Sequence, residues 1–175
     1  NLPSNKVLKE KLEYILNCKI LSINLFPYSS CSPTFRIRYM TNNIVSDIVL
    51  RGNPEYHNSV VGSYKPTIKK EIIVHNILLS NNINTATPLN DGEIYKIYLN
   101  SSSSSCFEFF LLSFVKGSAI DKNYKINSNY EIYFKRIAKA YYNLHNIYNS
   151  QYGIIGDNGS IINPFKNLED YIFDM

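Results

Sequence analysis

Residues 46–52 have the sequence SDIVLRG, an apolar run that ends in an arginine and a glycine. Ile48, Val49 and Leu50 follow one another without a polar interruption, which is typical of a strand that is covered on both faces. A guanidinium at the end of such a strand needs an anion. Two sources are open: the carboxylate of Glu71, twenty positions further on (71 − 51), or a phosphate group of a ligand.

Glu71 lies in residues 68–79, IKKEIIVHNILL, whose apolar spacing predicts a helix. On this helix Glu71 shares a face with Ile68, whereas Lys70 lies elsewhere on the wheel. A carboxylate on an apolar face needs a partner. We therefore expect Glu71 to pair with Arg51, although a purely structural ion pair would explain the same two residues.

The remaining elements are predicted from their hydrophobic periodicity. Helices are expected over residues 4–17 and 129–150 and from 167, strands over 19–26, 34–40, 44–51, 93–99 and 107–115, and a small hairpin over 152–162. This order predicts an α+β fold: a five-stranded antiparallel sheet with one helix inserted after the third strand, followed by a linker and helices.

Composition limits the classes of partner. The chain has 175 residues, is 45% hydrophobic and carries a net charge of +4 without a basic block, so it shows no nucleic-acid footprint. No apolar run approaches the roughly 18 residues of a membrane span. Three widely spaced cysteines indicate reduced thiols. We expect a cytoplasmic protein without nucleic-acid or membrane partners.

Four segments, in this order, resemble the aminoglycoside phosphotransferase family, the protein-kinase-like small-molecule kinases that include choline kinases. Residues 49–51, VLR, are similar to the strand-three segment whose cation contacts nucleotide phosphates, and Glu71 matches the helix glutamate that orients it. Residues 110–117, FLLSFVKG, resemble the hinge that pairs with the nucleobase. Residues 137–145, IAKAYYNLH, followed by a Tyr-Gly pair at 152–153, resemble the helix that opens the large lobe.

The resemblance implies a protein-kinase-like small lobe over residues 1–117, and the linker and first helices of a truncated C-terminal lobe over 118–175. The chain would be the nucleotide-binding part of a kinase. Such an enzyme transfers the γ-phosphate of ATP or GTP, with Mg²⁺, to a hydroxyl of a small aminoglycoside- or choline-like substrate.

By the same resemblance, Arg51 and Glu71 would serve the phosphates, and Ser113 and Val115 would hold the base through their backbone groups. Ser30, in the loop between the first two strands, would help to cover the phosphates, although prolines flank this loop. The family's catalytic loop and metal-binding aspartate have no match in the chain. No catalytic residue or metal ligand is therefore named, and by itself the chain is expected to be inactive, with the missing C-terminal lobe supplying both.

Two other interpretations remain open. The chain can be a non-catalytic, pseudokinase-like binding or regulatory domain that uses the same cleft for protein contacts. It can also be an unrelated α+β interaction domain without a nucleotide cleft, in which Arg51 and Glu71 would lie far apart. The apolar run of the hinge stretch, which ends at Gly117, is equally well explained as a core strand.

Overall fold

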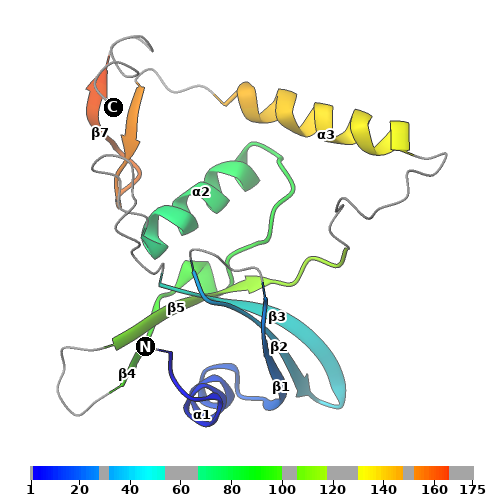
Figure 1. Ribbon diagram of the computed structural model, residues 1–175, viewed down its shortest axis with the longest axis vertical. Helices are drawn as coiled ribbons and strands as arrows, with labels where there is room; N and C mark the ends of the chain where they lie inside the picture. Colours follow the sequence, from blue (N-terminus) through cyan, green and yellow to red (C-terminus); the bar gives the residue numbers. More distant parts are fainter. Residues whose placement is uncertain are drawn as a thin grey trace.

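The computed structural model of the chain describes residues 2–27, 32–53, 67–99, 106–117, 130–147 and 152–165. The elements are α1 (Asn5–Leu16), β1 (Lys19–Leu25), β2 (Thr34–Thr41), β3 (Ile44–Gly52), α2 (Ile68–Ser80), the 3-10 turn η1 (Asn90–Gly92), β4 (Tyr95–Tyr98), β5 (Cys106–Ser113), α3 (Tyr130–His145), β6 (Tyr152–Ile155) and β7 (Ile161–Phe165). The described part of the chain is α+β, as the sequence predicts (Figure 1).

The central feature is a five-stranded antiparallel sheet with the strand order β1-β2-β3-β5-β4. Strands β2 and β3 are joined by Asn42 and Asn43, both of which have positive φ angles (51° and 63°). Such a pair matches the twist of a two-residue hairpin. The predicted sheet, with α2 inserted between its third and fourth strands in sequence, is confirmed.

The two faces of the sheet are covered by different helices. Leu8 and Leu12 of α1 are fully buried in one cluster with Ile48 and Leu50 of β3. On the opposite face, α2 packs onto the sheet around Phe110 in a second cluster. Figure 1 shows α1 below the sheet and α2 above it. The prediction that β3 is covered on both faces is confirmed, because its side chains alternate between these clusters.

The two helices next to the sheet begin at side-chain caps. Ser4 Oγ accepts a hydrogen bond from the Val7 amide at 3.4 Å. Thr67 Oγ1 accepts one from the Lys70 amide at 3.2 Å, and it donates to Oδ1 of Asp157 in the β6–β7 turn at 2.6 Å. A cap of this kind satisfies an amide that the helix leaves unpaired. The start of α2 is thus tied to the hairpin.

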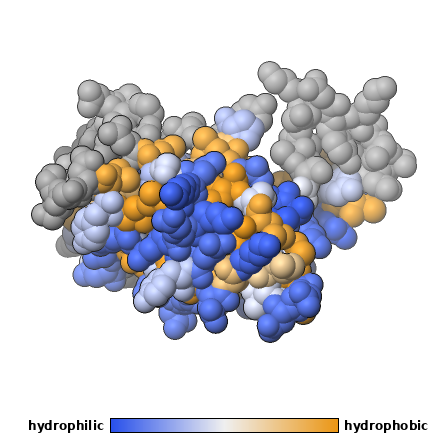
Figure 2. All heavy atoms as spheres, turned by 90° about the horizontal axis from the view of Figure 1, so that it is seen from below, coloured by the Kyte–Doolittle hydropathy of each residue, from blue (hydrophilic) through white to orange (hydrophobic). Residues whose placement is uncertain are grey.

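Some boundaries differ from those expected. β5 ends at Ser113 rather than at residue 115, and β4 is shortened by η1, where Asn90 and Asp91 adopt left-handed conformations (φ 49° and 54°). The helix expected from residue 167 lies outside the described residues. Seen from below, the α1 side presents mainly hydrophilic side chains with hydrophobic ones between them (Figure 2). None of the helices in the described ranges is both long and apolar enough to cross a membrane.

Candidate functional site

Arg51 and Glu71 form a bidentate ion pair that links β3 to α2. Nε of Arg51 donates to Oε2 of Glu71 and Nη2 donates to Oε1, both at 2.9 Å. The side chains are only 28% and 25% exposed. Two parallel charge-assisted bonds fix the guanidinium plane as well as its position. The predicted contact is confirmed, and the alternative in which these side chains lie far apart is wrong.

Thr34 holds the third side of the same guanidinium. Nη1 of Arg51 donates to Thr34 Oγ1 at 2.8 Å, and this hydroxyl donates to the carbonyl of Ser32 at 3.0 Å. Thr34 is the cross-strand partner of Arg51 in the β2–β3 register. In the sequence, Thr34 alternates with apolar residues together with Arg36 and Arg38, which is typical of the polar face of a half-exposed strand, so this contact was not predicted. No residue that the structure describes bonds to the remaining N–H donors of Arg51.

The glycine after Arg51 has a packing role. A Cβ atom at Gly52 would lie 2.5 Å from the Phe107 ring and 2.9 Å from the Pro33 ring. The Gly52 amide also donates to the Pro33 carbonyl at 2.8 Å. Because β3 approaches its neighbours so closely at this point, only glycine fits without a shift. The close approach fixes the backbone directly beside Arg51.

A pocket of about 430 Å³ lies between α2 and the sheet, at the ion pair. Its lining residues are Thr34, Val49, Arg51, Lys70, Glu71, Val74, His75 and Leu112. The volume falls within the range of small-molecule sites, roughly 300–1,000 Å³. The lining combines charged groups of β3 and α2 with aliphatic side chains of β3, β5 and α2. The pocket can therefore take a ligand with an anionic end and an apolar part.

Lys70 is a pocket residue that the sequence interpretation placed elsewhere. It is only 8% exposed and lines the pocket next to Glu71. The helical wheel separates Lys70 from Glu71, but a helix against a curled sheet contacts it over a wide arc, so both positions face the pocket. Lys70 and Arg51 bring two cations to one carboxylate in the lining. Counted over the charged side chains that line the described pocket, cations outnumber carboxylates by two to one, which favours an anionic ligand.

His75 also lines the pocket, as a packed, uncharged ring. It is half-buried, lies edge-on to Phe110 with 6.5 Å between ring centroids, and has Nδ1 3.1 Å from Thr85 Oγ1. Burial lowers the pKa of His75 below its ordinary value. Its ring is consequently neutral at physiological pH and adds no charge to the site.

The two expected hinge residues, Ser113 and Val115, differ in whether the protein already occupies their polar groups. The Ser113 amide donates to the Thr87 carbonyl at 2.9 Å, and Ser113 Oγ accepts from the Thr87 amide at 2.8 Å. That amide is therefore engaged within the protein. Val115 follows the end of β5 and is 64% exposed. Ser30 lies outside the described residues, so its expected role stays a prediction.

The chemistry that this site offers is anion binding. Within the described ranges, no group of three or more histidine, cysteine, aspartate or glutamate residues is arranged to hold a metal ion. What the pocket contains is a preorganised guanidinium, a second cation at Lys70 and an aliphatic wall.

Comparisons with known proteins identified no similar protein. No protein-family model matches the chain, no curated protein matches it, and no solved structure matches its fold.

Proposed function

We propose that the chain is the nucleotide-binding part of a protein-kinase-like small-molecule phosphotransferase that uses ATP or GTP with Mg²⁺. The acceptor would be a hydroxyl of a small aminoglycoside- or choline-like molecule. The proposal is carried by one observation: the strand cation Arg51 is held by the helix carboxylate Glu71 at a pocket between α2 and the sheet. The free thiols of Cys18 and Cys106 agree with a cytoplasmic location.

In this proposal Arg51 and Lys70 bind the phosphates. Arg51 is already fixed by Glu71 and Thr34, so a phosphate that accepts from its remaining N–H donors immobilises no further long side chain. Charge-assisted bonds to phosphate are stronger than neutral ones. Glu71 acts as a positioning residue, because it holds the guanidinium rather than the ligand.

The aliphatic wall formed by Val49 and Leu112 suits a flat, apolar base. Val115, just beyond the end of β5, would pair with the edge of that base, and Ser113 would contribute its carbonyl. Mg²⁺ would offset the negative charge of the phosphates. Its ligands and the catalytic base are expected outside this chain, so the chain alone should lack turnover. The division into a nucleotide lobe (residues 1–117) and the start of a second lobe (118–175) belongs to the same proposal.

A second candidate is a non-catalytic, pseudokinase-like binding or regulatory domain. One observation favours it: the Ser113 amide, at the expected hinge, is already bonded to Thr87. A site with fewer free backbone groups is less suited to base pairing and equally suited to a protein contact.

Nucleotide-dependent thermal stabilisation separates these candidates. Mg-ATP or Mg-GTP at millimolar concentration should raise the melting temperature of the wild-type chain, since a ligand that binds only the folded state stabilises it. Arg51→Met should abolish the rise. Lys96→Met is the matched control, because Lys96 is 51% exposed and pairs with Glu108 on β4 and β5, away from the pocket.

Two results would each contradict one part of the phosphotransferase proposal. Wild-type protein that is unaffected by millimolar nucleotide would favour the regulatory domain. Phosphoryl transfer to any acceptor by this chain alone would contradict the expectation that the catalytic groups lie elsewhere.

A further inference from the structure

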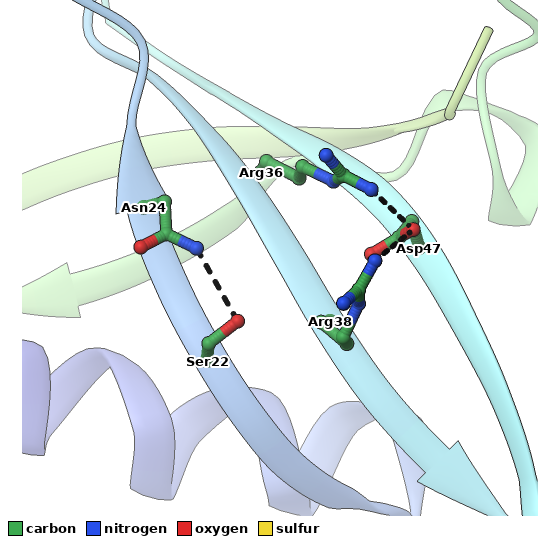
Figure 3. Close-up of polar contacts among 5 residues, drawn as sticks. All are labelled: Ser22, Asn24, Arg36, Arg38 and Asp47. Carbon is green, nitrogen blue, oxygen red and sulfur yellow. Dashed lines mark hydrogen bonds and ion pairs between the residues drawn. The ribbon is translucent and has the colours of Figure 1, made fainter. Parts of the chain in front are cut away.

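A second charged cluster lies on the same face of the sheet as Arg51. Arg36 Nη2 donates to Asp47 Oδ2 at 2.7 Å, and Arg38 donates to the same carboxylate through Nε at 3.1 Å and Nη2 at 3.3 Å. Figure 3 shows both arginines of β2 turned toward Asp47 on β3. Their hydrogen bonds lower the pKa of Asp47 to about 2. As at the pocket, two cationic side chains, here Arg36 and Arg38, lie beside one carboxylate.

Arg36 also packs on an aromatic ring, a contact that Arg38 does not make with any described residue. The guanidinium carbon of Arg36 lies 4.4 Å from the centroid of the Phe114 ring. Phe114 directly follows β5 and stands between Ser113 and Val115. A guanidinium at this distance from a ring is held by cation–π attraction and stacking. Phe114 and Asp47 therefore fix the plane of Arg36, whose side chain is still 36% exposed.

The position of Arg36 relative to the pocket follows from the strand register. Arg36 is paired with Val49 and Thr34 with Arg51, and all of these except Arg36 line the pocket. Arg36 is thus next to the aliphatic wall of the pocket. Arg36 lies one strand across from β3 and two residues along from Arg51. The backbones of Arg36 and Arg51 are therefore about 8 Å apart. Groups so placed on one face can bind opposite ends of a single extended ligand.

We propose that Arg36, held flat by Phe114 and Asp47, is the residue on which the nucleobase stacks. This inference rests on the proposed function, since it assigns the base end of the ligand whose phosphates Arg51 binds. A planar guanidinium stacks on a base through the same forces that hold it against Phe114. Stacking of this kind contributes about tenfold or more to affinity. Arg36 thereby makes binding depend on the base and not only on the phosphates.

The test compares ligands with and without a base. Affinities of the purified chain for Mg-ATP, Mg-GTP and inorganic tripolyphosphate are measured by calorimetry. Arg36→Lys keeps the charge and removes the plane, so it should weaken both nucleotides about tenfold and leave tripolyphosphate unchanged. Phe114→Leu removes the supporting ring without altering a charge and should act in the same direction. Arg38→Lys is the matched control: Arg38 shares the Asp47 carboxylate, and no ring contact is found for it among the described residues.

Each outcome decides the inference. Selective loss of nucleotide affinity in Arg36→Lys and Phe114→Leu, with Arg38→Lys unchanged, supports stacking. Equal loss for nucleotides and tripolyphosphate, or no loss in either variant, overturns it and leaves the proposed function standing. Wild-type protein that binds tripolyphosphate no more weakly than nucleotides also overturns it. Wild-type protein that binds none of the three ligands refutes the proposed function itself, and the stacking role with it.

Discussion

The Arg51–Glu71 pair should be coupled in stability far more strongly than a surface ion pair. The perturbation is a double-mutant cycle with Arg51→Met, Glu71→Gln and the double variant. Exposed pairs contribute about 0.2–1 kcal/mol, whereas removing one partner of a buried pair costs about 3–5 kcal/mol. With two bonds of 2.9 Å and side chains 28% and 25% exposed, we expect a coupling energy between these limits, about 2 kcal/mol.

The bond from Arg51 to Thr34 does not enter this number. It is lost in both variants that lack the arginine, so it cancels in the cycle. Without this cancellation the Arg51→Met variant alone would overstate the strength of the ion pair.

Urea unfolding monitored by far-UV circular dichroism measures the four free energies of unfolding, and the chain has no tryptophan to report by fluorescence. The control cycle uses Lys96 and Glu108, whose single contact of 2.7 Å joins side chains that are 51% and 31% exposed, and it should give a smaller coupling energy. A coupling energy for Arg51 and Glu71 no larger than that of the control would refute the reasoning. Arg51 would then be free in solution, and the argument that the site is preorganised would fail.

Three further predictions concern the surroundings of the site, and each is checked by urea unfolding. Gly52→Ala should destabilise the fold by about 1–3 kcal/mol, because its Cβ would meet the Phe107 ring at 2.5 Å. Gly117→Ala, whose Cβ would meet no atom of the described residues within 4 Å, should be nearly neutral. The pKa of Asp47 is lowered from 3.8 to about 2. The ionised carboxylate should therefore contribute about 1 kcal/mol, after screening, to the free energy of unfolding above about pH 4, and this contribution should be lost as the pH falls through about 2. If Asp47→Asn has the same dependence of stability on acid pH as the wild type, this prediction is wrong. Thr67→Ala should remove the cap of α2 at a cost of about 1 kcal/mol, while Thr67→Ser should retain most of the stability; equal losses in both would show that the hydroxyl is not what matters.

The sequence predicted those parts of the fold that depend on local patterns. An apolar run ending in Arg51 and a carboxylate on an apolar helix face each required a partner, and their pairing was the simplest solution. Lys70 could not be placed in this way, because its burial depends on how α2 lies against a curled sheet. The contact between Arg36 and Phe114 likewise depends on where the chain turns after β5, which hydrophobic periodicity does not specify.

The contacts of Thr34 and Asp47 could be predicted only in part, because the sequence pattern shows the face on which each side chain lies but not its partner. The alternation of β2 and β3 shows which side chains share a face, but not which residues lie opposite each other. The register supplies this, and in a hairpin the turn sets the register. With Asn42 and Asn43 as the two turn residues, every partner is symmetric about them, which places Thr34 opposite Arg51 and Asp47 opposite Arg38. The Thr34–Arg51 contact at the pocket and the Arg38–Asp47 contact beside it are therefore both consequences of a single two-residue turn, whereas Glu71 reaches the pocket from α2. A turn one residue longer would have set Arg51 against a different neighbour.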